Sequence, residues 1–225
     1  MNYKIVKLQE LQGDGFLNRK YLENPKLSEQ SYIEQHKFFL ELIMGFSAKN
    51  FIKIFSEAGN KPEVIFWNNQ ILQKKWAKEN DSNYKEENWL VEIILCQLKE
   101  MKPDILFFQN TSSLPYDIRR NIKNIIPSIK RVVIEEDHPG AYQDFSDSDI
   151  FIVDTPVLAE RYKNLKPPLV YHAFDDDILN NELLQKNNHK EFELGFLGSL
   201  RFPESRYYLL KELENSFDLN IWADK

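Results

Sequence analysis

Cysteine is nearly absent from this sequence, because Cys96 is the one cysteine among 225 residues. An internal disulfide and a multi-cysteine metal site are therefore both excluded. The four histidines are dispersed and do not have the spacing of a zinc site. Cys96 lies on an apolar helical face, where we expect a buried and inert thiol. We predict no protein-bound metal and no other resident cofactor.

Long apolar runs are also absent. No stretch approaches the ~20 apolar residues that a membrane-spanning helix needs. The opening residues lack the continuous apolar core of a signal peptide. The simplest expectation is a soluble cytoplasmic protein without a transmembrane segment.

The sequence also lacks an excess of positive charge. The chain has 29 Lys and Arg against 35 Asp and Glu, which gives a formal net charge of −6. Its basic residues are dispersed, and short clusters such as Arg119-Arg120 are expected on solvated helix faces. A general nucleic-acid binder needs concentrated positive charge, so we expect no nucleic-acid partner.

The sequence does contain enough apolar residues for a core. Short apolar runs alternate along the chain with segments whose apolar residues recur at helical spacing. Hydrophobic residues make up 42% of the chain, so global disorder is excluded. Buried strands are expected at residues 3–8, 63–67, 104–108, 131–134, 150–153 and 169–171. Helices are expected at residues 31–57 (divided near Gly45 and ended by Ala58-Gly59-Asn60), 70–79, 87–101, 115–126 and 156–162, and irregular structure at 17–30. This order predicts an α/β fold, a Rossmann-like parallel sheet with helices on both faces.

The last thirty residues repeat the same pattern. A buried strand, a glycine-containing turn, an amphipathic helix and a second strand predict an incomplete second βαβ segment. We therefore expect a first domain at 1–174, a connector at 175–190 and the start of a second domain at 191–225. Function is then expected in the cleft between the two.

Ligands of parallel sheets bind beyond the carboxyl ends of the strands, so the loops there hold the candidate residues. After the first strand, Gly13 and Gly15 would let the backbone approach a ligand, and Asp14 could accept a proton. An ordinary turn explains the same residues. After the third strand, Gln109, Asn110 and Thr111 suit a polyhydroxyl ligand, although Thr111 to Ser113 could instead cap the next helix.

The densest chemical cluster follows the fourth strand, at Glu135-Glu136-Asp137-His138-Pro139-Gly140. Three neighbouring carboxylates oppose one another's ionisation, which raises their pKa values, and they favour a protonated histidine. A group with a pKa near neutrality is what a general base requires. A solvated acidic turn is the alternative. His172 follows the last strand, where it either contacts a ligand or packs at the domain boundary.

Of two further motifs, one is not expected to bind a ligand and the other is. Asp147-Ser-Asp149 has the spelling of a metal–diphosphate motif, but it precedes its strand and so lies at the wrong edge of the sheet. The turn at Gly198, Ser199 and Arg201, with Arg206 on the following helix, offers backbone N–H groups, a helix N-terminus and two cations to a diphosphate.

The order of several loose motifs resembles bacterial GT-B-fold glycosyltransferases, particularly the CgeB-like and O-antigen-type branch. The motifs are Phe55-Ser-Glu-Ala-Gly59, Trp76-Ala-Lys-Glu79, Lys102-Pro-Asp-Ile-Leu-Phe-Phe-Gln109, Pro168-Leu-Val-Tyr-His-Ala-Phe-Asp175 and Gly195-Phe-Leu-Gly-Ser-Leu-Arg201. The resemblance covers residues 40 to 222. In that family a later carboxylate grips the nucleotide ribose, and its region has no counterpart before Lys225. The isolated chain is therefore expected to be inactive, as a fragment or one module of a larger enzyme.

The resemblance implies transfer of a sugar from a nucleotide-sugar to a glycan or similar acceptor in bacterial surface polysaccharide synthesis. Asp137, His138 or Asp14 would be the base, and Gly198, Ser199, Arg201 and Arg206 would bind the donor. The acceptor would contact Gly13, Gly15, Gln109, Asn110, Thr111, Glu136 and His172. Peripheral membrane association and a homodimer stay open. The alternative is a non-catalytic scaffold that binds glycan or protein.

Overall fold

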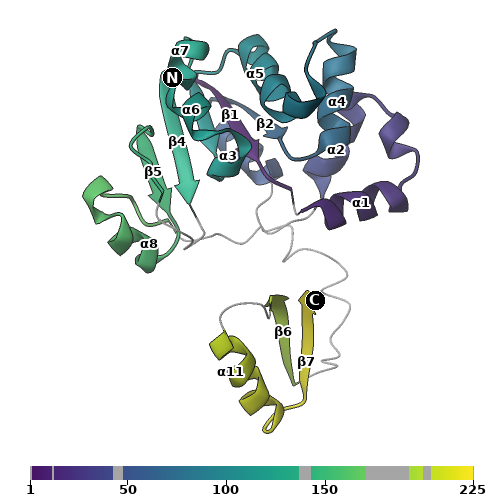
Figure 1. The fold of residues 1–225 in the computed structure, drawn as a ribbon, viewed down its shortest axis with the longest axis vertical. Coiled ribbons are helices and arrows are strands. Elements are labelled where there is room, and N and C mark those ends of the chain that lie inside the picture. The colour runs from purple at the N-terminus through teal and green to yellow at the C-terminus, as the bar shows by residue number, and fades with distance from the viewer. Residues whose placement is uncertain are drawn as a thin grey trace. The chain divides into compact units, whose positions relative to one another are not determined.

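The chain forms two compact units, Met1–Asp175 and Asp176–Lys225. This computed structural model describes residues 2–11, 13–42, 48–136, 143–170, 193–199 and 204–224. Figure 1 shows the larger unit built on one sheet with helices around it, and the smaller unit as two strands and a helix.

The larger unit is organised by a five-stranded sheet in the order β2-β1-β3-β4-β5. Every neighbouring pair is parallel, and Leu8 of β1 lies opposite both Ile65 and Phe108. The strands are β1 Lys4–Gln9, β2 Lys61–Phe66, β3 Ile105–Phe108, β4 Arg131–Glu136 and β5 Ile150–Val153. The strand expected at 169–171 is an isolated bridge between Leu169 and Val153, and Tyr171 lies outside the described residues.

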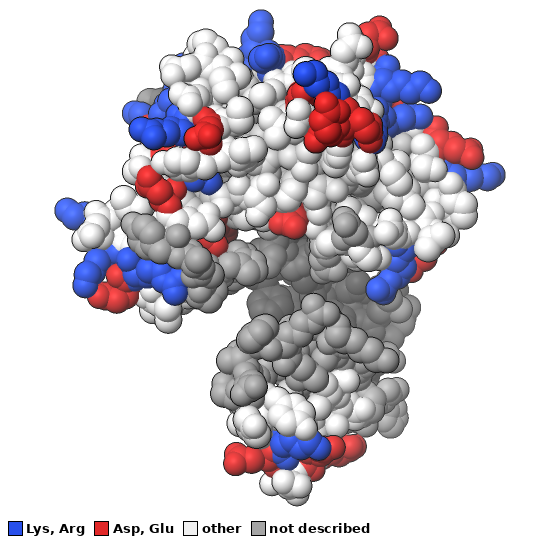
Figure 2. Space-filling view, viewed as in Figure 1, with Lys and Arg blue, Asp and Glu red and all other residues white. Residues whose placement is uncertain are grey.

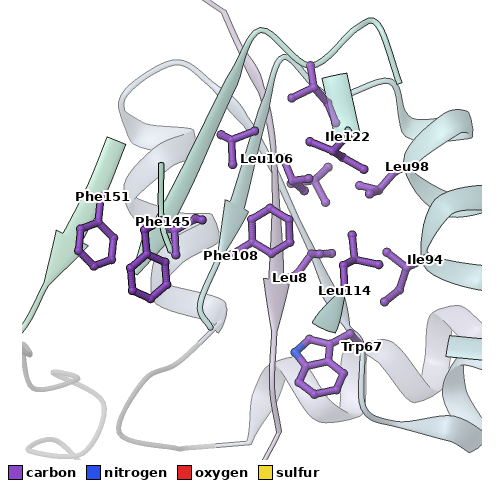
Figure 3. Packing of buried hydrophobic residues seen from close by; sticks show 14 of the residues in the cluster. Leu8, Trp67, Ile94, Leu98, Leu106, Phe108, Leu114, Ile122, Phe145 and Phe151 are labelled. Carbon is purple, nitrogen blue, oxygen red and sulfur yellow. The ribbon is translucent and has the colours of Figure 1, made fainter. Parts of the chain in front are cut away.

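Helices cover both faces of this sheet, because side chains alternate along each strand. On one face, Leu8, Leu106 and Phe108 pack with Ile94 and Leu98 of a helix (Figure 3). The elements packed on this face are α5 Trp89–Met101, α6 Tyr116–Arg120, α7 Ile122–Ile125 and α8 Pro156–Arg161. The parallel sheet covered on both sides confirms the predicted α/β, Rossmann-like fold class.

The opposite face has a second core. Val64 and Phe66 of β2 point here, whereas Ile65 between them belongs to the first core. Leu17, Phe39 and other apolar side chains complete this cluster. They come from α1 Asp14–Glu23, η1 Leu27–Glu29, α2 Tyr32–Glu41, α3 Ala48–Glu57 and α4 Gln70–Glu79.

Three expectations need correction. Residues 17–30 are not irregular, since α1 and η1 occupy most of them. The helix expected at 115–126 is divided into α6 and α7 at Asn121. The helix expected at 87–101 begins with the 3-10 turn η2 Glu86–Asn88. The division of 31–57 into α2 and α3 is confirmed, although Gly45 lies outside the described residues.

The smaller unit has the predicted βαβ pattern. Its strands β6 Leu194–Ser199 and β7 Leu219–Asp224 are parallel, and α11 Glu204–Glu214 connects them. Leu210 of the helix is buried. The carboxyl end of β6 and the start of α11 therefore belong to one crossover connection.

Candidate functional site

The candidate site lies at the carboxyl edge of the five-stranded sheet, where the strand order reverses between β1 and β3. From β1 the chain continues to β2 on one side, and from β3 it continues to β4 on the other. Ligands of open parallel sheets bind at such a reversal. The residues that follow these two strands are therefore the first to consider.

Side chains bridge the ends of β1 and β3. The backbone N–H of Glu10 donates to Gln109 Oε1 at 3.0 Å. Asn110 Nδ2 donates to a carboxylate oxygen of Glu10, while Asn110 Oδ1 accepts from Ser112 N–H at 3.1 Å. The predicted ligand contacts Gln109 and Asn110 thus use much of their hydrogen-bonding capacity within the protein. Gln109 holds the backbone of Glu10 at the reversal, and Asn110 holds its carboxylate.

Glu10 is a residue that the sequence reasoning missed. It directly follows β1 and is half-buried, and its partner Asn110 is 100 positions away. The one available signal was its position directly after the first strand, because the chain order reverses beside that strand. Glu10 is thus a described carboxylate at the strand reversal.

Hydrogen bonds also join the residues that follow β1 to those that follow β2. Asn68 Oδ1 accepts from Leu11 N–H, and Asn68 Nδ2 donates to Leu11 O, both at 2.8 Å. The next residue, Asn69, caps α4 by accepting from Leu72 N–H at 3.2 Å. Asn68 thus holds Leu11 beside the end of β2, and Asn69 begins α4.

Gly13, Asp14 and Gly15 form the start of α1, so Gly15 lies in a helix and not in a loop. Gly13 is the N-cap residue, and its carbonyl accepts from Phe16 N–H at 2.8 Å. Neither glycine has a positive φ, and a Cβ at either position would meet nothing within 4 Å. The turn itself therefore does not require glycine. The side chain of Asp14 lies outside the described residues.

Thr111 belongs to η3 Thr111–Ser113 and contacts the segment that returns toward β5. Its Oγ1 donates to Gln143 Oε1 at 2.9 Å. The expected cap of the next helix is wrong, because the N-cap residue of α6 is Pro115 and no side chain caps it, while Asn110 caps η3. Thr111 thus connects the β3 loop to the β4–β5 connection.

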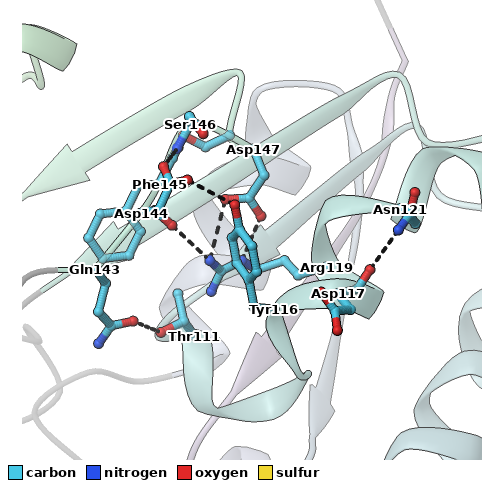
Figure 4. A network of polar contacts seen from close by, with 11 residues as sticks. Thr111, Tyr116, Asp117, Arg119, Asn121, Gln143, Asp144, Phe145, Ser146 and Asp147 are labelled. Carbon is cyan, nitrogen blue, oxygen red and sulfur yellow. Dashed lines mark hydrogen bonds and ion pairs between the residues drawn. The ribbon is translucent and has the colours of Figure 1, made fainter.

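A polar network fixes the returning half of the β4–β5 connection (Figure 4). Arg119 Nε lies 2.6 Å from Asp147 Oδ2, and Arg119 Nη2 donates to Asp144 O at 3.1 Å. Tyr116 Oη donates to Asp144 Oδ2 at 2.8 Å. Hydrogen bonds to its carboxylate, first from the Ser146 backbone and then from side chains including Tyr116, lower the pKa of Asp144 to about 2.

Arg119 is a second correction, because the Arg119-Arg120 pair was expected on a solvated face. The side chains of Arg119 and Asp147 are only 3% and 4% exposed. Asp149 pairs with Lys123 and accepts from Val132 N–H at 2.6 Å, at the amino end of β5. Asp147 and Asp149 therefore hold the fold together, and the prediction that they lie away from the ligand edge is confirmed.

Several predicted residues remain untested. Asp137, His138, His172 and Arg201 lie outside the described residues. Glu136 ends β4 and is only 6% exposed.

In the smaller unit, Gly198 and Ser199 end β6 and Arg206 lies in the first turn of α11, although none of their side chains is described. The carboxyl end of a strand followed by a helix N-terminus is the arrangement that binds phosphate groups in many α/β folds. The diphosphate site at these residues stays a prediction.

The described surface gives limited further information. On the face shown in Figure 2, acidic and basic side chains are interspersed. Within the described ranges, no group of three or more His, Cys, Asp or Glu could hold a metal ion. The helices of those ranges include none whose length and apolarity would let it cross a membrane.

Comparison with known proteins adds no relative. No family model, no curated protein and no solved structure matches this chain.

Proposed function

We propose that this chain belongs to a nucleotide-sugar-dependent glycosyltransferase of the GT-B type. The larger unit would bind the acceptor, and the smaller unit would open the part that binds the donor. The observation that carries the proposal is the presence of two α/β units with parallel strands in one chain. The first of them has a carboxylate and amides at its strand reversal. GT-B enzymes are built from two such units.

The reaction joins an acceptor hydroxyl to the anomeric carbon of the donor sugar as the bond to the nucleoside diphosphate breaks. The proton of the hydroxyl passes to a base, for which Glu10 joins Asp14, Asp137 and His138 as a candidate. One oxygen of Glu10 accepts from Asn110, which orients the carboxylate. Backbone N–H groups at Ser199 and the N-terminus of α11, with Arg201 and Arg206, would stabilise the departing diphosphate.

Transfer from a nucleotide-sugar needs no resident cofactor in this proposal, and it would take place in the cytoplasm. The acceptor would be a glycan or similar molecule of a bacterial surface polysaccharide. Association with the membrane surface and a homodimer are compatible with this setting.

Nucleotide binding and turnover test the proposal. We expect the full chain, or the complete enzyme that contains it, to be stabilised thermally by one of UDP, GDP, CDP or dTDP. Glu10→Gln should reduce turnover by about 100-fold or more, as loss of a general base does. Glu87→Gln is the matched control, because Glu87 is exposed in η2 away from the strand ends. Arg201→Ala should also lower turnover by orders of magnitude.

The outcomes separate the parts of the proposal. Normal turnover of Glu10→Gln would transfer the base role to Asp14, Asp137 or His138 and leave the function standing. Absence of affinity for every nucleoside diphosphate would overturn the function.

One observation favours a second function, a non-catalytic scaffold that binds glycan or protein. The side chains of Gln109 and Asn110 form hydrogen bonds that join the ends of β1 and β3. The same polar groups are therefore less accessible to a substrate. Glycan or protein binding without nucleotide binding would establish this alternative.

A further inference from the structure

We propose that one side of α1 is a binding groove for a neutral oligosaccharide, which extends away from Asn68 at the end of β2. Three adjoining pockets of about 280, 560 and 450 Å³ follow one another there. The first and second share Asn18 and Tyr21, and the second and third share Pro25. We call this row of pockets the α1 groove. Several sugar units could lie along it, open to solvent over the second and third pockets, because pockets for single small ligands begin near ~300 Å³.

The first pocket is lined by four neutral amides, of which Asn18 and Gln70 leave their hydrogen-bonding capacity toward the described residues unused. Asn18 and Gln70 line it with exposed amides that make no hydrogen bond within the part of the chain that the structure describes. Asn69 lines the same pocket, is 99% buried, and has no partner for its Nδ2 among those residues. Amides can both donate to and accept from hydroxyl groups, which suits a polyhydroxyl ligand.

The same pockets offer apolar surface beside the amides. The ring of Tyr21 lines the first two pockets, and Ile71 lines the first with 41% of its surface exposed. Leu22 lines the second pocket and is 78% exposed. Sugar rings present C–H faces as well as hydroxyl groups. A mixed lining of this kind therefore matches a sugar better than it matches a fully polar ion or a fully apolar chain.

The charge of the groove decides which sugars fit. No residue that lines the first two pockets carries a charge, and the third contains one Glu23 and one Lys26, whose charges cancel. Burial raises the pKa of Tyr21 to about 12, so its hydroxyl group stays neutral. The negative charge of a nucleotide or an acidic sugar would lose part of its hydration here, and no unpaired cation of the first two pockets would compensate for that loss. The groove therefore favours neutral oligosaccharides.

The lining is held in place before a ligand arrives. Tyr21 Oη donates to Gln35 Oε1 at 3.0 Å, and Gln35 Nε2 donates to Gln30 O at 2.9 Å. Asn68, at the inner end of the groove, makes its two bonds to Leu11. A pre-organised lining lowers the entropic cost of binding.

Titration by nuclear magnetic resonance tests the inference with the full chain and no nucleotide present. The probes are maltotetraose, cellotetraose and mannotetraose, with tetragalacturonate as the acidic arm and tetra-alanine as the peptide arm. We expect one neutral tetrasaccharide to bind with a dissociation constant of about 1 mM or tighter. The side-chain amide signals of Asn18 and Gln70 should shift.

Paired variants locate the binding. Asn18→Ala with Gln70→Ala should weaken binding by about tenfold, because two hydrogen bonds are lost. Asn124→Ala, an exposed asparagine of α7, is the matched control and should bind as the parent does. Binding that the double variant leaves unchanged would overturn the inference. So would binding of tetragalacturonate or tetra-alanine alone, or of no probe. Nucleotide affinity is measured separately, so either proposal can fail without the other.

Discussion

Individual amide side chains give the ligand edge of the larger unit its shape. Asn68 joins the exits of β1 and β2, and Gln109 and Asn110 join those of β1 and β3. Each contact links positions 57 to 100 residues apart, so the amides fix tertiary structure and not local turns. The same distance explains why sequence reasoning assigned Gln109 and Asn110 to a ligand and overlooked Glu10. Their partners can be identified only after the strand order is known.

The buried pair of Arg119 and Asp147 should be a major contributor to stability. Arg119→Met would leave a buried carboxylate without its cation, and we expect a loss of about 3–5 kcal/mol in the free energy of unfolding. Urea denaturation measures it. Replacing both residues, as Arg119→Met with Asp147→Leu, should restore most of the loss, since no unpaired charge remains.

The neighbouring residue provides the control for this pair. Arg120 is exposed, so Arg120→Met should change stability by no more than about 0.5 kcal/mol. Equal stabilities of the Arg119 and Arg120 variants would contradict the anchoring role of Arg119.

Acid should destabilise the larger unit through His36. Its Nε2 lies 2.8 Å from Val64 O, and its ring packs between those of Tyr32 and Phe66. Burial lowers the pKa of His36 below its ordinary 6.5, although the Val64 carbonyl and Glu63 oppose the shift. The unfolded chain then binds a proton at higher pH than the folded chain does. Stability is therefore expected to fall as the pH drops from 6.5 through the folded-state pKa.

Urea midpoints measured from roughly pH 7.5 to roughly pH 5.5 check this expectation. His36→Gln keeps an N–H donor for Val64 O but does not titrate. Its midpoint should therefore fall less over this range than that of the parent. Parallel curves for the two proteins would show that His36 does not cause the dependence.

At the scale of elements, the buried strands were predicted well and the polar helix α1 was not. Strands covered on both faces are short apolar runs, which local sequence reveals. The α1 sequence is mostly polar, and its helical form depends on Leu17 packing into the second core. Similarly, the expected break within 31–57 followed from glycine, whereas the division of 115–126 at Asn121 has no comparable signal. Tertiary packing determines the helical form of α1 and the division at Asn121, and a single sequence does not reveal that packing.

Two glycines with opposite geometry offer a matched test of the helix ends. Gly59 follows α3 with φ 78°, and Asn60 N–H donates to Phe55 O at 2.9 Å. Gly59→Ala should cost about 1–2 kcal/mol, because a Cβ is strained in the left-handed region. Gly15→Ala should instead stabilise by about 0.5 kcal/mol, since Gly15 lies in α1 with open space at its Cβ position. Thermal denaturation compares the two, and equal effects would contradict the assigned backbone conformations.

At the scale of the whole molecule, both units use the same connectivity of parallel strands and a crossover helix. The fold class of the larger unit followed from the order of its elements alone. The candidate site did not, because its residues come from three separate loops and several of its predicted members lie outside the described residues. The stability of the larger unit rests on the first core, which extends across all five strands.

The side chain of Phe108 lies at the centre of that core and is fully buried in β3. Phe108→Ala should lower the free energy of unfolding by about 3–5 kcal/mol, through lost burial and the cavity left behind. Since a typical domain has about 5–15 kcal/mol in total, this loss would remove a large share of the stability and lower the denaturation midpoint. Ile54→Ala is the control, because Ile54 is 61% exposed on α3 and should change stability by no more than about 0.5 kcal/mol. Guanidinium denaturation that gave both variants the same midpoint would mean that the sheet is not held together by this core.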